Sequence, residues 1–88
     1  GITGLNVYPN PFEKDFVIEI HLPENGDLNI RMINSNGQVV DNFFASYMRK
    51  GTYQLPWSDE HNLSPGLYWL EVSFGRKPLT GIKLVKVR

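Results

Sequence analysis

The sequence predicts an all-β domain, an immunoglobulin-like antiparallel β-sandwich of about seven strands with Greek-key connections. Apolar side chains recur at every second position along most of the chain, which is the pattern of half-buried strands, and no window shows the spacing of an amphipathic helix. Turn residues separate these stretches at intervals of roughly 8–12 residues. The 88 residues, 41% of them hydrophobic, have material for one core, so we expect a single domain over residues 1–88.

The first three strands follow from this alternation. Residues 6–8 form a short strand that ends at Pro9 and Pro11, because proline lacks the N–H group that a sheet needs. Residues 16–22 give the clearest strand, and its core face carries Phe16, Ile18, Ile20 and Leu22. After a turn, residues 28–34 form the third strand, with an inward set of Leu28, Ile30 and Met32.

The fourth strand has an ambiguous inward face. The Asn36-Gly37 pair predicts a hairpin turn into residues 38–44. Two alternating sets are apolar in this stretch, Val39 with Phe43 and Val40 with Phe44. We therefore expect either a β-bulge or burial on both faces.

The last three strands surround a polar loop. Residues 52–57 carry Tyr53, Leu55 and Trp57 on one side, and Pro56 favours an edge position in its sheet. The loop covers residues 58–66, and the final strands cover residues 67–74 and 80–87.

Composition excludes several classes of function. Nine basic residues balance nine acidic ones, which argues against a broad nucleic-acid footprint. The absence of cysteine excludes disulfides and thiolate metal sites. No segment approaches the ~20 apolar residues of a transmembrane helix, and the start lacks a signal-peptide pattern. Because the chain begins with Gly1 and not with Met, we expect it to be a piece excised or processed from a longer protein.

Candidate catalytic and metal-binding residues are few. His21 lies on the polar face of its strand with no sequence-adjacent partner, so it is interpreted as a surface histidine. The loop holds Asp59, Glu60 and His61 in a row, but this spacing is not that of a calcium loop or a zinc site. We expect no catalytic residue, no metal and no cofactor.

Trp69 raises the alternative of a carbohydrate-binding module. It alternates with Tyr68 and Leu70 and therefore points away from the core, where it could stack on a sugar ring. A structural or adhesive β-sandwich of a surface protein would show the same alternation. Both alternatives stay open at this point.

The final strand is a candidate binding surface. Lys83, Lys86 and Arg88 are interleaved with apolar residues, and nothing follows to cover them. A strand at a sheet edge presents unpaired backbone groups to which another protein can add a strand. Alternatively, the lysines protect the edge against aggregation. The residues alone do not separate these interpretations.

Three motifs together resemble a known family. The chain opens with Tyr8, Pro9, Asn10, Pro11 and Phe12, later has Gly66 and Tyr68 at a Pro-Gly corner, and ends on the basic strand. The tyrosine is expected to bond back to nearby backbone, as in a tyrosine corner. This ordered set resembles the type A C-terminal sorting domain of cargo proteins of the type IX (Por) secretion system of Bacteroidetes.

The resemblance implies a non-catalytic secretion signal that is excised from the end of a longer secreted protein. It implies a passenger in transit through the periplasm, delivery to the outer-membrane translocon, and a final place at the cell surface or outside the cell. A sortase-like cysteine peptidase would remove the domain and attach the passenger to anionic lipopolysaccharide. The translocon would read Lys83, Leu84, Val85, Lys86, Val87 and Arg88, whereas the other two motifs would shape the fold. A homodimer formed through an edge strand is a further hypothesis.

Overall fold

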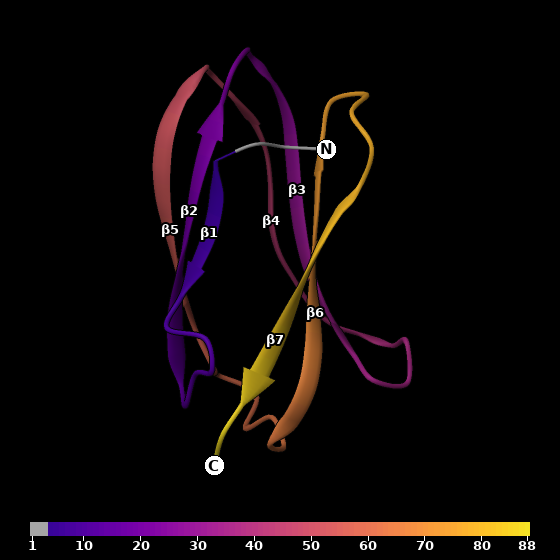
Figure 1. Ribbon diagram of the computed structural model, residues 1–88. Coiled ribbons are helices and arrows are strands. Elements are labelled where there is room, and N and C mark those ends of the chain that lie inside the picture. The colour runs from indigo at the N-terminus through magenta and orange to yellow at the C-terminus, as the bar shows by residue number, and fades with distance from the viewer. Residues whose placement is uncertain (1–3) are drawn as a thin grey trace.

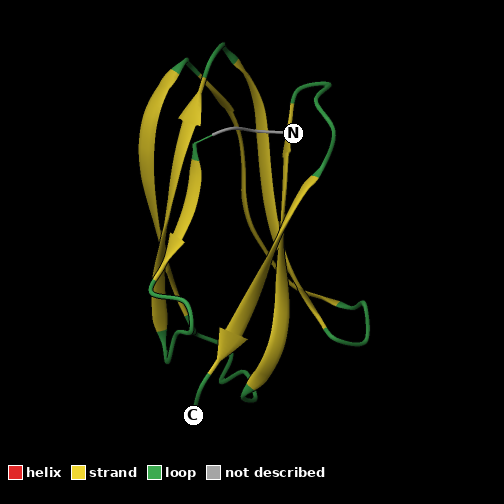
Figure 2. Cartoon of the chain, viewed as in Figure 1, coloured by secondary structure: helices red, strands yellow, loops and turns green. Residues whose placement is uncertain are grey.

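The computed structural model describes residues 4–88, and these residues form strands and loops without a helix (Figures 1 and 2). No described segment is therefore a helix that could cross a membrane. The strands are β1 (Leu5–Tyr8), β2 (Asp15–Leu22), β3 (Gly26–Asn34), β4 (Val39–Met48), β5 (Gly51–Ser58), β6 (Gly66–Phe74) and β7 (Thr80–Lys86).

The strands are arranged in two sheets that face each other, as Figure 1 shows. One sheet has the order β1-β2-β5 and the other β4-β3-β6-β7, and all neighbouring strands are antiparallel. The chain crosses between the sheets from β2 to β3, from β4 to β5 and from β5 to β6. This confirms the predicted β-sandwich, and it also confirms the edge position that Pro56 indicated for β5.

The core lies between the sheets and consists of the alternating inward residues. The inward sets predicted for β2 and β3 are fully buried, which confirms both strands. Strand β6, which lies next to β3 in the four-stranded sheet, adds further side chains to the core, and β5 of the three-stranded sheet adds Trp57. The β6 side chains in the core are Tyr68, Leu70, Val72 and Phe74.

Strand β4 contains the irregularity that its sequence predicted. Its pairing with β3 shifts register between Ile30 and Arg31 and again between Met32 and Ile33. As a result, Phe43 and Phe44 are adjacent in sequence and yet both pack against the core. The shifts resolve the ambiguity of the inward set, because an extra residue at a bulge changes which side chains face inward.

Candidate functional site at the end of strand β7

Strand β7 is an edge strand, and its side chains divide into two groups. Leu84 is fully buried, and Lys86 points to the same inner side and is also buried. Lys83, Val87 and Arg88 are exposed, and Val85 is half-buried on the outer side. The six residues predicted for recognition thus serve both to anchor the strand and to present side chains outside the core.

A segment from the start of the chain lies along the end of β7. After β1 the chain leaves its own sheet and reaches β7, where Phe12 forms an isolated parallel bridge with Lys86. The N–H of Phe12 donates to the carbonyl of Val85 at 2.9 Å, and the N–H of Val87 donates to the carbonyl of Phe12 at 2.9 Å. The early motif and the terminal strand are therefore parts of one structural unit.

The Asn10 side chain extends this pairing by one step. Its Nδ2 donates to the carbonyl of Lys83 at 2.9 Å, and its Oδ1 accepts the N–H of Val85 at 3.1 Å. A side-chain amide thus makes the two hydrogen bonds that backbone N–H and C=O groups of a neighbouring strand would make. We call residues 10–12, with these four hydrogen bonds, the edge clamp.

The edge clamp corrects one expectation from the sequence. The terminal strand was expected to be uncovered, but its outer edge is closed from the carbonyl of Lys83 to the N–H of Val87. The reason is the turn around Pro9 and Pro11, which lack N–H groups and leave Asn10 and Phe12 to pair with β7.

Phe12 holds the edge clamp in place from inside the core. Its side chain is 1% exposed. Its ring meets Phe16 edge to face at a centroid distance of 5.0 Å and Trp57 at 5.9 Å. Phe16 and Trp57 are themselves stacked at 4.7 Å. Because aromatic pairs of this geometry add to the energy of burial, the backbone of Phe12 is firmly attached to the core.

Lys86 connects the clamp to the loop after β5. Its Nζ lies 3.6 Å from Oδ2 of Asp59, and the two side chains are only 6% and 5% exposed. The same Nζ donates to the carbonyls of Glu13 and Arg88, and it lies 5.7 Å from the centroid of the Phe12 ring. A buried ammonium needs such partners, because desolvation alone would disfavour its charge.

Asp59 organises its own loop while it faces Lys86. Its carboxylate accepts the N–H of His61 at 2.9 Å and that of Leu63 at 3.0 Å. Burial tends to raise the pKa of Asp59, but these backbone hydrogen bonds and the charge of Lys86 outweigh it and hold the pKa below its ordinary value. Asp59 is therefore ionised at neutral pH.

The predicted tyrosine corner is present at the other end of this loop. The hydroxyl of Tyr68 donates to the carbonyl of Ser64 at 2.5 Å, which confirms the expected bond to backbone just upstream. Burial, followed by the charge of Asp59, raises the pKa of this hydroxyl, so it stays protonated as a donor. Gly66 adopts a φ of 146°, a backbone conformation that residues with a Cβ rarely adopt.

The acidic run in this loop does not converge on one point. Asp59 faces Lys86, whereas Nε2 of His61 lies 3.5 Å from Oδ2 of Asp41 on β4. Within residues 4–88 no group of three or more His, Asp and Glu side chains is placed to hold a metal ion. His21 is exposed, and its Nδ1 lies 3.0 Å from Oγ1 of Thr52.

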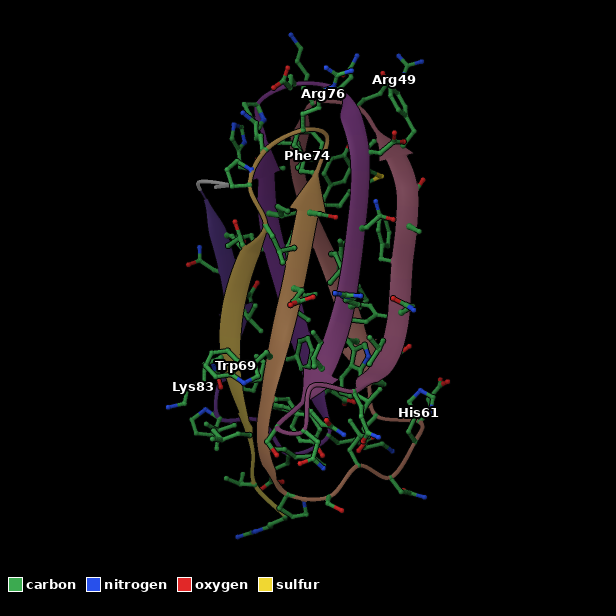
Figure 3. The ribbon with its side chains drawn as sticks, turned by 90° about the vertical axis from the view of Figure 1, so that its right-hand side faces the viewer. Arg49, His61, Trp69, Phe74, Arg76 and Lys83 are labelled. Carbon is green, nitrogen blue, oxygen red and sulfur yellow. The ribbon has the colours of Figure 1, made fainter. Side chains whose placement is uncertain are left out.

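Trp69 lies on the outer face of the four-stranded sheet and is 41% exposed. Figure 3 shows it beside Lys83, its register partner on β7. Its partner on the other side is Ile33 of β3. Neither neighbour is aromatic, so Trp69 lacks the adjacent rings that a sugar-binding platform of this kind requires.

Two elements of this site were missed by the sequence reasoning. The burial of Lys86 had a usable signal, because it continues the alternation of Ile82 and Leu84 on the inner face. The pairing of Asn10 with β7 had none, because it joins residues 73 and 75 positions apart through a side chain.

The fold and the site define a small β-sandwich in which a short early motif and the terminal strand form one surface. A sequence model of the family described as the secretion system C-terminal sorting domain matches residues 6–87. The chain belongs to this family, whose members are non-catalytic signals for type IX secretion. Membership implies interaction with the secretion system and export to the cell surface or the medium. The comparisons with curated proteins and with solved structures gave no significant match.

Proposed function

We propose that this domain takes a periplasmic passenger to the type IX outer-membrane translocon, and that the translocon reads the end of β7. The observation that supports this is the division of the strand. Leu84 and Lys86 attach it from inside, so Lys83, Val87 and Arg88 are held outside in a fixed geometry. A folded sandwich thereby offers a short sequence signal as a shaped, positively charged surface.

Later steps of the proposed route follow from the family. Residues 1–88 form the C-terminal sorting domain of a longer protein, and a sortase-like cysteine peptidase removes it and attaches the passenger to the cell surface. The early motif and the corner at Gly66 and Tyr68 act through the fold, since their described contacts are to backbone and core. A homodimer through an edge strand is a separate hypothesis that the sorting function does not require, and light scattering on the purified domain tests it.

The experiment measures export of a fluorescent protein that carries a signal peptide and this chain in a bacterium with a type IX system. The informative variant is Lys83→Ala with Arg88→Ala, because both side chains are exposed. Arg88 also contacts Glu13 at 3.4 Å, but that pair is largely exposed and contributes little to stability. We expect this variant to fold normally and to accumulate in the periplasm.

A matched control removes the same amount of charge at the other end of the sandwich. Arg49 and Arg76 are exposed, and Figure 3 shows them far from Lys83. Arg49→Ala with Arg76→Ala should be exported like the unaltered fusion. Equal export of both variants would contradict recognition at the end of β7, and retention of the unaltered fusion in the periplasm would contradict the sorting function itself.

A further inference from the structure

The edge clamp closes only part of the outer edge of β7. Val85 directs both its N–H and its carbonyl outward, so the alternation of an antiparallel strand also directs the backbone groups of Lys83 and Gly81 outward. The side chain of Asn10 already donates a hydrogen bond to the carbonyl of Lys83. The N–H of Lys83 and both backbone groups of Gly81 have no hydrogen-bond partner within residues 4–88.

The closed part of the edge consists of two unequal halves. Phe12 pairs through its backbone, and its ring is fixed in the core against Phe16 and Trp57. Asn10 is an exposed residue that reaches β7 through its side chain alone. Rotation of the Asn10 side chain would free Lys83 and Val85, whereas release of Phe12 would require part of the core to open.

An added strand could replace Asn10 without loss of hydrogen bonds. The Asn10 amide gives one donor to the carbonyl of Lys83 and one acceptor to the N–H of Val85. The backbone of an incoming strand offers the same donor and acceptor from its N–H and C=O groups. The parallel bridge at Phe12 already shows that this edge accepts an extended segment.

We infer that residues 81–85 of β7 are the acceptor edge for an extended strand of the type IX apparatus, which displaces the Asn10 side chain and stops at Phe12. This inference rests on the proposed function and specifies its partner. Backbone hydrogen bonds supply the binding, as in other cases of strand addition, and side chains beside the edge supply specificity.

The charge of the edge indicates the chemistry of the partner strand. Lys83 is exposed and forms no ion pair with any residue that the structure describes. A charged residue is stabilised by an opposite charge directly across on a neighbouring strand and destabilised by a like charge there. The partner strand therefore carries a carboxylate opposite Lys83.

Gly81 allows this inference to be tested with a matched pair of variants. A Cβ added at Gly81 meets no atom within 4 Å, so Gly81→Ala leaves the edge intact. Gly81→Pro removes the outward N–H and places a ring on the edge, but it leaves the bonds to β6 in place, as proline on an edge strand does. Both variants are placed in the fluorescent fusion, and their thermal unfolding is measured on the purified domain.

We expect Gly81→Ala to be exported normally and Gly81→Pro to be exported about tenfold less, since a tenfold change corresponds to the net loss of one or two hydrogen bonds. Normal export of a folded Gly81→Pro would overturn the inference while leaving the sorting function intact. Failure of the unaltered fusion would instead overturn the proposed function. Should Gly81→Pro unfold, Lys83→Pro is compared with Lys83→Ala. Both variants lack the lysine charge and only Lys83→Pro lacks the outward N–H, so lower export of Lys83→Pro supports the inference and equal export overturns it.

A second copy of this domain is the competing occupant of the edge. Sedimentation of the purified domain distinguishes it from the apparatus. A monomer at all concentrations supports a strand of the apparatus. A dimer that Gly81→Pro converts to a monomer assigns the edge to self-association and overturns the inference.

Discussion

Asn10 and Val85 lie 75 positions apart, and yet Oδ1 of Asn10 accepts the N–H of Val85 at 3.1 Å. This contact makes the two most distant motifs of the chain interdependent. The early motif determines how much of the terminal strand can be reached from outside, and the terminal strand is the extended segment with which residues 10–12 pair. The two motifs thus form one unit only in the folded domain.

The first prediction concerns Asn10→Ala. The substitution removes two hydrogen bonds to β7 and should lower the free energy of unfolding by about 1–2 kcal/mol. The loss is local, so hydrogen exchange of the Val85 amide should accelerate about tenfold more than that of core amides in β3. NMR-detected exchange measures both. Asn29→Ala, an exposed change on β3, is the control. Equal protection of Val85 in all three proteins would show that the Asn10 bonds are absent in solution.

The second prediction concerns deletion of residues 83–88. This change removes Leu84, which is fully buried, and leaves Asp59 without Lys86. The combined loss exceeds about 5 kcal/mol, which is comparable with the whole stability of a small domain. Circular dichroism and thermal unfolding should therefore show an unfolded chain, so lost export of the truncated domain would not by itself locate the signal. A cooperative unfolding transition of the truncated domain would contradict the prediction that it is unfolded.

These residues show which features of the structure the sequence could predict. Alternation in β2, β3 and β6 predicts which side chains form the core, because burial on one face imposes a period of 2. Alternation could not predict the edge clamp. Asn10 acts through one side chain on a strand more than 70 residues away, and no local pattern encodes that contact. The burial of Lys86 could have been predicted in part. Alternation places its side chain inward, although its charge suggests an exposed position.

The third prediction concerns Tyr68→Phe. The phenol donates at 2.5 Å to the carbonyl of Ser64 across the loop between β5 and β6. Its removal should destabilise the domain by about 1 kcal/mol and lower the melting temperature by about 4–8 °C. Tyr47→Phe is the control, because the Tyr47 side chain is 63% exposed and its hydroxyl can bond to water. Identical melting of the two variants would show that the corner contributes nothing to stability.

The fourth prediction concerns the acid sensitivity that Asp59 confers. Its pKa is below the ordinary 3.8 in the folded state, so the unfolded chain binds more protons as the solution is acidified. The contribution is therefore complete at neutral pH, begins to decline near pH 3.8, and is lost as the pH falls through the lowered pKa. Asp59→Asn removes this pH-dependent contribution to stability, and it also leaves Lys86 buried without the Asp59 carboxylate.

Two results are expected for Asp59→Asn in urea unfolding at a series of pH values. At pH 7 the variant should be less stable by about 3 kcal/mol, because one partner of a buried pair has been removed. Below about pH 4 its stability should fall less steeply than that of the unaltered domain, so the two curves converge. Asp15→Asn, at an exposed carboxylate, controls for the general effect of charge. Parallel curves for Asp59→Asn and the unaltered domain would mean that Asp59 titrates alike in both states, and that Lys86 is held by the carbonyls of Glu13 and Arg88 alone.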